Sequence, residues 1–335
     1  MCVLVGTEDK EVITLAHGSG GKQTARLIDE FFVPAFHKEL HDGALLNISG
    51  QNIVFTTDSY VVQPLFFPGG DIGTLAVNGT INDLAMCGAK PLYLSCGFII
   101  EEGFLKSDLQ RIVQSMQQAA ETCGVSIVTG DTKVVERTGA NNIFINTSGI
   151  GILMSEKAIH PARIESGDCI VLSGDIGRHG MAIMAAREGF SVDLKSDCAP
   201  LFDPVQVLIQ AEIDVHCLRD PTRGGLATTL VELAEQAKLS FHIEEEKIEV
   251  SSPVKSVCEV LGFDPLYVAN EGRFVAFVPE SQAAKTLKSL SEFYEKPAII
   301  GHVHNRSGDR VIINNALGTS RYLHRLVGDQ LPRIC

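Results

Sequence analysis

Four aspartates lie at the ends of predicted structural elements, where their carboxylates could hold a divalent cation. Asp58 ends a β-rich run, and Asp83 lies near the end of an apolar helical stretch. Asp131 and Asp220 stand in turns rich in glycine or proline that follow strand-like runs. Carboxylate oxygens are the ligands that Mg²⁺ prefers. Because the chain carries a formal net charge of −13, we expect a phosphate-bearing ligand to reach it through such cations.

A glycine-rich turn near the start of the chain precedes a predicted helix over 24–36. A strand, a glycine turn and a helix N-terminus together can bind an anion. The match to known phosphate loops is poor, because Gln23 stands where such loops carry Ser or Thr, so a plain flexible turn explains the pattern equally well. The first residue of the turn could touch a phosphate or only close the turn. The turn consists of His17, Gly18, Ser19, Gly20, Gly21 and Lys22.

The predicted helix over 74–88 is too apolar for a surface helix. Its strongly polar members are Asn78, Asn82 and Asp83. Helical spacing places the two asparagines on one face with the aspartate beside them. These groups are either structural hydrogen-bonding residues or ligands of a bound molecule.

Lys133 and Glu271 are candidates for moving protons. Lys133 lies two residues after Asp131 beyond the predicted strand 125–129, and both side chains are expected near one sheet edge. Glu271 follows Asn270 just before another predicted strand. The alternatives are an ordinary surface lysine and a glutamate that caps a turn.

Cys335 places a thiol at the last residue of the chain. Gly328 permits a hinge, Pro332 stiffens the segment, and Arg333 favours the thiolate. An arm from 328 to 335 reaches at most about 24 Å, enough to carry the sulfur into a cleft of its own subunit. The alternative is a disordered tail whose cysteine has no role.

Composition limits the classes of function. The acidic balance argues against nucleic acid as a partner. The nine cysteines form no C-x-x-C pair, which favours a reduced, cytoplasmic protein. Neither a signal peptide nor a run long enough to span a membrane is expected.

The predicted fold is α/β (α+β), because strand-like runs alternate with helical periodicity along both halves of the chain. A length of 335 residues suggests about two domains. We expect an N-terminal domain over 1–160, a C-terminal α/β domain over 161–327, and a flexible tail over 328–335.

Together these segments resemble the HypE family, the carbamoyl dehydratases of NiFe-hydrogenase maturation. The resemblance covers nearly the whole chain from about Ile13, and looser forms of the internal motifs occur in aminoimidazole ribonucleotide synthetase, selenophosphate synthetase and thiamine-monophosphate kinase. The final motif distinguishes the HypE family from these relatives. The matching motifs are residues 17–22, 57–59, 82–83, 130–135, 219–225, 270–272 and 332–335.

The resemblance implies a two-domain synthetase-superfamily fold and a homodimer whose N-terminal domains share a β-barrel. It implies ATP between the domains beneath the glycine-rich turn, with Mg²⁺ held by Asp58, Asp83 and Asp220. It implies catalytic roles for Cys335, Lys133 and Glu271. The remaining residues that it assigns to cofactor binding are His17, Gly18, Gly20, Gly21, Lys22, Asn82, Asp131 and Asn270.

The activity implied by the resemblance takes place on the chain itself. A HypF-type carbamoyltransferase would place a carbamoyl group on Cys335 as a thiocarboxamide. ATP-dependent dehydration would turn that group into a thiocyanate, and the cyanide would pass to iron on a HypC–HypD complex. Two alternatives remain: an ATP-dependent synthetase or kinase of the same superfamily that acts on a small molecule, and a non-catalytic metal-trafficking protein that uses the terminal thiol as a ligand.

Overall fold

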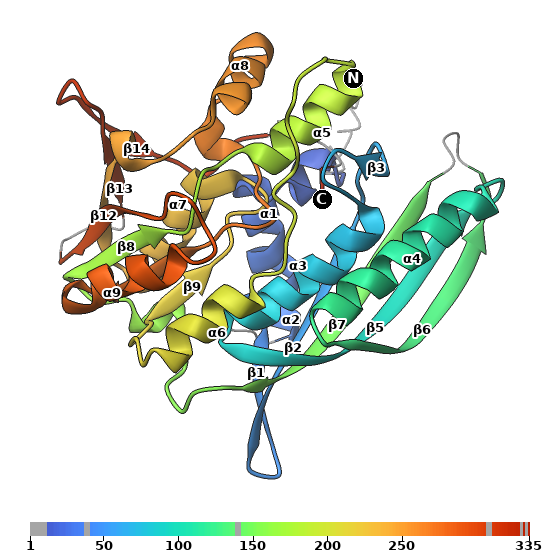
Figure 1. The fold of residues 1–335 in the computed structure, drawn as a ribbon, viewed down its shortest axis with the longest axis horizontal. Coiled ribbons are helices and arrows are strands. Elements are labelled where there is room, and N and C mark those ends of the chain that lie inside the picture. Colours follow the sequence, from blue (N-terminus) through green and yellow to red (C-terminus); the bar gives the residue numbers. More distant parts are fainter. Residues whose placement is uncertain (1–11, 37–40, 138–141, 306–309, 329–330, 332–333) are drawn as a thin grey trace, which may run out of the picture.

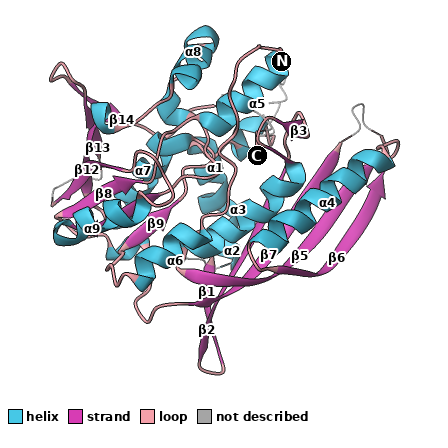
Figure 2. Ribbon diagram, in the orientation of Figure 1, coloured by secondary structure: helices cyan, strands magenta, loops and turns pink. Residues whose placement is uncertain are grey.

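The computed structural model describes residues 12–36, 41–137, 142–305, 310–328, 331 and 334–335. Two β-sheets with their helices form the two halves of the molecule (Figures 1 and 2). Within the described residues, no helix combines the length and apolar composition needed to cross a membrane.

The N-terminal half is built on a five-stranded sheet in the order β1-β2-β7-β5-β6, in which only the neighbours β5 and β6 are parallel. Its inner face is covered by helices α3 and α4 (Figure 1). A small hairpin, β3 and β4, precedes α3. The bounds are β1 Ala44–Ile48, β2 Gln51–Tyr60, β3 Phe66–Phe67, β4 Gly70–Asp71, α3 Ile72–Met86, β5 Ala89–Glu101, α4 Lys106–Thr122, β6 Ser126–Val135 and β7 Ile143–Leu153.

Alternation along β2 separates the two faces of this sheet. Val54, Thr56 and Tyr60 are buried on the inner face, whereas Phe55 is exposed on the outer face. Successive side chains of a strand point to opposite faces, so Asp58 shares the inner face with Thr56. The outer face is left uncovered by the described part of the chain.

Helix α3 lies at the centre of the molecule. It begins at Ile72 because the Asp71 carboxylate accepts a hydrogen bond from the Thr74 amide at 2.9 Å and so caps the helix. Nearly all of its residues are buried, because it packs against the first sheet on one side and against α6 on the other. Its two asparagines face the C-terminal half, where Asn78 contacts Cys198 and Asn82 bonds to the Ala199 carbonyl.

The C-terminal half is built on a seven-stranded sheet in the order β14-β13-β10-β12-β8-β11-β9. Helix α9 packs on β8, β11 and β12, and α7 packs on β10, β13 and β14. The bounds are β8 Asp168–Leu172, α5 Arg178–Glu188, α6 Phe202–Gln210, β9 Cys217–Arg219, α7 Gly225–Ala237, β10 Ser240–Glu244, α8 Ser252–Leu261, β11 Val275–Pro279, α9 Glu280–Leu290, β12 Ala298–His304, β13 Val311–Asn314 and β14 Ser320–Leu323.

A short N-terminal helical segment contacts the C-terminal half through Gly18 and Lys22, which bond to Arg223 and Leu326. A 3₁₀ turn at Leu15–Gly18 precedes helix α1, Lys22–Leu27, which continues through a π-helical turn into α2, Val33–Phe36. The expected helix over 24–36 is therefore present, and it begins two residues earlier. The end of the chain returns to the same region, beside β3 and α5 (Figure 1).

Two expected strands are longer than their sequences indicated. β2 continues to Tyr60, and β6 continues to Val135. The expectations that Asp58 ends a strand and that Asp131 and Lys133 stand beyond one are therefore wrong, because all three lie inside strands. Each extended strand keeps its backbone hydrogen bonds with a neighbour across these polar positions, and this pairing overrides the local preference for a turn.

Candidate active site

Three carboxylates from separate elements form a compact acidic cluster. Asp42 precedes β1, Asp83 lies on α3, and Asp220 follows β9. One ligand oxygen of each lies within 4.8 Å of those of the other two. Because Asp220 comes from the C-terminal half, the cluster exists only when the two halves are packed together.

Mutual repulsion in this cluster is strong. Burial is the main cause that raises the pKa of Asp83 well above its ordinary value, and Asp220 adds to it. Burial likewise raises the pKa of Asp220 to about 7, with Asp42 contributing. Oδ2 of Asp42 has no hydrogen-bond partner among the described residues. Crowded hard-oxygen ligands with an unused buried oxygen fit a divalent cation such as Mg²⁺.

Asp58 lies at the border of this cluster. Burial raises its pKa, and the Arg223 guanidinium opposes that rise. Asp58 in turn contributes to the raised pKa values of Asp83 and Asp220. Of the three expected metal ligands, the structure therefore places Asp83 and Asp220 in the compact cluster. Asp42 is the third member of that cluster, and Asp58 lies close by.

Glu271 is a buried carboxyl group next to the acidic cluster, only 3% exposed. Its Oε1 has no hydrogen-bond partner within the described chain. Burial raises its pKa well above the ordinary value, and Asp220 and Asp197 add to the effect. Its backbone is fixed, because Oδ2 of Asp197 accepts hydrogen bonds from the amides of Glu271 and Gly272 at 3.3 and 3.0 Å.

Asn82 joins α3 to the C-terminal half. Its Nδ2 donates to the carbonyls of Ala199 at 3.2 Å and Glu271 at 3.4 Å, and its Oδ1 accepts from the Leu201 amide at 2.8 Å. In this conformation the side chain fixes the backbone on which Glu271 stands.

Asn270 has a similar role within the C-terminal half. Its Oδ1 accepts from the Gly177 amide at 2.6 Å, and its Nδ2 donates to the carbonyl of Pro221 at 3.0 Å. The Asn270 side chain thus connects the loop after Asp220 with the start of α5. Like Asn82, it is engaged with backbone groups in this conformation.

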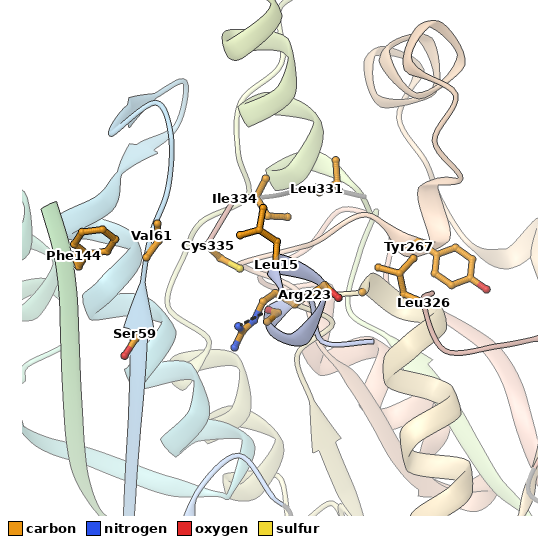
Figure 3. A pocket seen from close by; sticks show the side chains of 13 residues that line it. Leu15, Ser59, Val61, Phe144, Arg223, Tyr267, Leu326, Leu331, Ile334 and Cys335 are labelled. Carbon is orange, nitrogen blue, oxygen red and sulfur yellow. Dashed lines mark hydrogen bonds between the residues drawn. The ribbon is translucent and has the colours of Figure 1, made fainter. Parts of the chain in front are cut away.

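The end of the chain occupies the cleft between the two halves. Cys335 is half-buried beside Arg223, in a pocket of about 350 Å³ to which Ser59 contributes from β2 (Figure 3). Burial, with a contribution from Glu271, raises the pKa of the Cys335 thiol, and Arg223 opposes that rise. The thiol, a buried carboxyl and a guanidinium therefore share one site.

The glycine-rich turn packs over this cleft. The Lys22 amide donates to the Leu326 carbonyl at 3.0 Å, and Arg223 Nη1 donates to the Gly18 carbonyl at 3.2 Å. A Cβ on Gly20, whose φ is +76°, would lie 3.1 Å from Cβ of Arg223. His17 caps the preceding 3₁₀ turn at Leu15–Gly18, because its Nδ1 accepts from the Thr14 amide at 3.1 Å. The turn thus connects the N-terminal helix to Arg223 and to residues 324–327, here called the final segment, which lead into the tail.

Asp131 and Lys133 lie apart from the acidic cluster and from the site around Cys335. They form an ion pair at 3.4 Å with side chains about 70% exposed. Asp58 and Gly130 lie on one row across β2, β7, β5 and β6, so three strand spacings, roughly 14 Å, separate them. Gly130 shares the inner face with Asp58, and therefore Asp131 and Lys133 point outward. Within one subunit they are not brought together with Glu271.

Two residues of the site were missed as individual candidates in the sequence. Asp42 precedes a strand that shows little polar alternation, and the signal that could have found it is His41-Asp42-Gly43, a turn just before an apolar run. Arg223 lay within a recognised motif, but nothing in its spacing showed that it faces the terminal thiol. Only the tertiary fold places Arg223 next to Cys335.

The fold and the interdomain acidic cleft define a protein of the AIR synthase-related class. The model of the N-terminal domain of AIR synthase related proteins matches residues 40–153, and that of the C-terminal domain matches residues 165–314. The sheet of each half falls largely within the corresponding match.

Similarity to known proteins over nearly the whole chain identifies one family within this class. The chain is 46% identical to the carbamoyl dehydratase HypE of Azotobacter vinelandii over 96% of this chain and 97% of the relative. A crystal structure of a HypE–HypF complex matches at 47% identity with a TM-score of 0.84, covering 90% of this chain and 99% of that one. A crystal structure of HypE in complex with ATP matches at 46% identity with a TM-score of 0.82, covering 97% and 100%. The chain belongs to the HypE family of carbamoyl dehydratases, which acts in hydrogenase maturation.

Proposed function

We propose that this protein dehydrates a thiocarboxamide on its own Cys335 to a thiocyanate, at the expense of ATP, and so supplies cyanide for the iron of NiFe-hydrogenase. The observation that carries the proposal is the position of the Cys335 thiol in the interdomain cleft, beside Glu271 and Arg223 and close to the acidic cluster. A carbamoyl group on that sulfur would lie among acidic, basic and metal-binding groups.

ATP and Mg²⁺ are the proposed co-substrate and cofactor. The relative crystallised with ATP supports the first, and the cluster of Asp42, Asp83 and Asp220 supports the second. These carboxylates, with Asp58 nearby, would hold the cation, which when bound supplies positive charge to the phosphates. The glycine-rich turn from His17 to Lys22 would cover the nucleotide, because it already packs on Arg223 and the final segment.

The reaction balances in two steps. The carbamoyl oxygen attacks the γ-phosphorus of ATP, ADP leaves, and the nitrogen loses one proton. The carbon–oxygen bond then breaks, phosphate leaves with that oxygen, and loss of the second nitrogen proton gives the nitrile carbon–nitrogen bond. Phosphorylation is needed because an amide oxygen is otherwise a very poor leaving group. Arg223 offers its guanidinium to the negative charge that develops beside the sulfur.

Glu271 is the proposed acceptor of the nitrogen proton. Its neighbours in the cleft include Cys335, and the raised pKa makes its ionised form a stronger base than an exposed carboxylate. Its backbone is held by Asp197 and Asn82, which fixes the carboxyl group in the cleft. Asn82 and Asn270 are therefore proposed to position the site through their bonds to the backbone beside Glu271 and Asp220.

The outer face of the first sheet supports a homodimer. It is uncovered within the described chain and carries apolar side chains on four strands, a face that a second copy would bury. We propose that two such faces close into a shared β-barrel. In that arrangement, Lys133 and Asp131 would belong to the site of the partner subunit, because both point away from their own. The exposed apolar residues are Leu46, Phe55, Tyr93, Ile99, Ile150 and Ile152.

Two other partners follow from the proposed chemistry. A HypF-type carbamoyltransferase is proposed as the donor, supported by the relative that was crystallised with HypF. A HypC–HypD complex is the proposed acceptor of the cyanide.

A cytoplasmic location suits a reactive thiol, and the eight described cysteines are all free. We retain the division into 1–160, 161–327 and the tail 328–335, supported by strands that fall within 44–153 and 168–323.

Mass spectrometry of the peptide that ends in Cys335 tests the proposal. The protein is first carbamoylated with a HypF-type enzyme, carbamoyl phosphate and ATP, then given Mg²⁺ and ATP in a single turnover. The carbamoylated peptide should lose the mass of one water molecule. A Cys335→Ala variant should acquire neither modification. An unmodified Cys335 in the unsubstituted protein would overturn the proposal.

A further inference from the structure

A buried histidine contacts the tail of the chain, residues 328–335, in the cleft. His179 lies in the first turn of α5 and is 0% exposed. Its Nε2 lies 2.6 Å from the backbone carbonyl oxygen of Ile334, the residue directly before Cys335. This hydrogen bond lies one residue from the thiol, and the proposed reaction steps do not use it.

The surroundings of His179 fix which nitrogen carries the proton. A carbonyl oxygen can only accept, so Nε2 must be the donor to Ile334. Nδ1 then accepts from the Ser196 hydroxyl, at 2.8 Å, and the hydroxyl oxygen accepts in turn from the Cys198 amide at 3.0 Å. Burial lowers the pKa of His179, which favours this neutral ring. The donor is thus oriented by a chain of hydrogen bonds to which the tail does not contribute.

Apolar contacts complete the binding of the tail. The Ile334 side chain is 4% exposed and belongs to the main hydrophobic core. The ring of Phe67 meets the His179 ring edge-on at 5.5 Å between centroids. A Cβ on Gly180 would lie 3.3 Å from Cδ1 of Leu331, so the tail also passes close to the helix backbone. Figure 3 shows Ile334 and Leu331 beside the helix, with Cys335 turned towards Arg223.

We propose that His179 is a positioning residue that latches the tail, holding the Ile334 carbonyl so that Cys335 lies at the dehydration site. This inference rests on the function proposed above, because it assumes that chemistry occurs on the docked thiol. The tail must leave the cleft to receive its carbamoyl group from another protein. Release breaks the hydrogen bond between His179 and Ile334 and withdraws the Ile334 side chain from the core. The contact therefore sets the ratio between tails docked in the cleft, where dehydration occurs, and tails released from it, where Cys335 accepts the carbamoyl group.

The latch predicts opposite effects on two rates. His179→Phe keeps a ring against Phe67 but removes the donor, and loss of one hydrogen bond shifts the ratio of docked to released tails by about tenfold. Modification of Cys335 by a bulky maleimide follows the released fraction and should become faster, measured on the C-terminal peptide by mass spectrometry. Single-turnover dehydration of the carbamoylated protein follows the docked fraction and should slow, and the two fold-changes should multiply to about ten. His179→Gln keeps an N–H at similar reach and should restore both rates to within about twofold.

Two further variants separate a latch from a general loss of structure. Ser196→Ala removes the hydroxyl that orients the ring and should change both rates in the same directions but less than His179→Phe. Ile334→Ala keeps the carbonyl while removing the buried side chain, and it should also speed labelling. If His179→Phe does not fold, the labelling rates of these two variants decide whether the contact holds the tail in the cleft. Equal labelling rates in all variants and in the unsubstituted protein would overturn the latch.

The two proposals fail in different ways. If the unsubstituted protein forms no thiocyanate while His179→Phe still exposes Cys335 to maleimide, the proposed function is wrong and the tail contact stands alone. If the unsubstituted protein forms thiocyanate and His179→Phe changes neither rate, the function stands and the latch is wrong. Slower dehydration that His179→Gln does not restore would also count against the latch, because it would indicate damage to α5 rather than loss of a donor.

Discussion

At the scale of single residues, the acidic cluster makes the stability of the metal-free protein depend on pH. The pKa of Asp220 is raised to about 7, whereas an aspartate in an unfolded chain ionises near pH 3.9. Between these values the unfolded chain has released a proton that the folded chain retains. The contribution of Asp220 to the free energy of unfolding therefore falls as pH rises from about 4 through 7. The contribution of Asp220 is fully present only below that window.

Asp83→Asn should relieve this repulsion. The variant removes one of the three clustered charges, so the metal-free protein should melt about 2–4 °C higher near pH 8, with little change near pH 5. Mg²⁺ should raise the Tm of the unsubstituted protein more near pH 8 than near pH 5, and it should raise that of the variant less. Differential scanning calorimetry at both pH values measures these shifts. Asp193→Asn, an exposed carboxylate on a loop, is the control. An equal Mg²⁺ shift in Asp83→Asn would show that the cation binds elsewhere.

Glu271→Gln isolates the step in which a proton leaves nitrogen. The amide keeps the shape of the carboxyl group but cannot accept the proton, so single-turnover dehydration should slow by about 10²–10⁴-fold. Carbamoylation of Cys335 should continue, because that step occurs with the tail outside the cleft. Quenched-flow mass spectrometry separates the two modifications. Glu292→Gln, an exposed residue of the same type, should leave both rates unchanged. A normal dehydration rate in Glu271→Gln would assign the proton to another group.

The sequence identifies most of the residues that form the site, but it does not predict how they are arranged. Asp83, Asp220, Glu271 and Cys335 were named from spacing and motif, and the fold brings them to one cleft. Asp42 was missed because a single aspartate before an exposed strand gives no periodic signal. Its place in the cluster depends on packing between segments far apart in the chain, which local patterns do not encode.

At the scale of elements, β6 shows where local patterns mislead. Its sequence contains a glycine followed by polar residues, a combination typical of a turn. The strand nevertheless continues, because it pairs with β5 up to Val135. A shift of one position along a strand changes which face a side chain occupies. The sequence therefore named Lys133 but could not assign its face. Helix α4, by contrast, follows its local pattern, because Ile112, Met116 and Ala120 recur every four residues and are buried together on one face.

The glycine-rich turn can be tested as a packing element. A Cβ on Gly21 would lie 2.3 Å from the Leu326 carbonyl oxygen, whereas one on Gly18 meets no described atom within 4 Å. Gly21→Ala should therefore lower the free energy of unfolding by about 1–3 kcal/mol, because the backbones must separate. Gly18→Ala is the matched control and should be nearly neutral. Urea unfolding measures both, and equal values would show that the turn is not packed on the final segment.

At the scale of the whole molecule, the site is assembled from parts that a single domain does not contain. The first half supplies Asp42 and Asp83, the second supplies Asp220 and Glu271, and the end of the chain supplies the thiol. Buried α3 connects these parts, because it packs against both halves. Lys133 is the exception, since it points outward from the sheet. If Lys133 takes part in the reaction, a second subunit must provide it.

Mixed dimers test whether Lys133 acts across the subunit interface. Lys133→Ala keeps the thiol but lacks the lysine, and Cys335→Ala keeps the lysine but lacks the thiol, so each variant alone should form little thiocyanate. In a mixed dimer, Cys335 of the first variant would face Lys133 of the partner subunit, and activity should return. Random mixing makes about half of the dimers mixed, each with one complete site, so the refolded mixture should regain about a quarter of the unsubstituted activity per chain. Thiocyanate on the C-terminal peptide is the measurement. If Lys133 acts only within its own subunit, no mixture of the two variants recovers activity, because Cys335 is then never in the same subunit as Lys133.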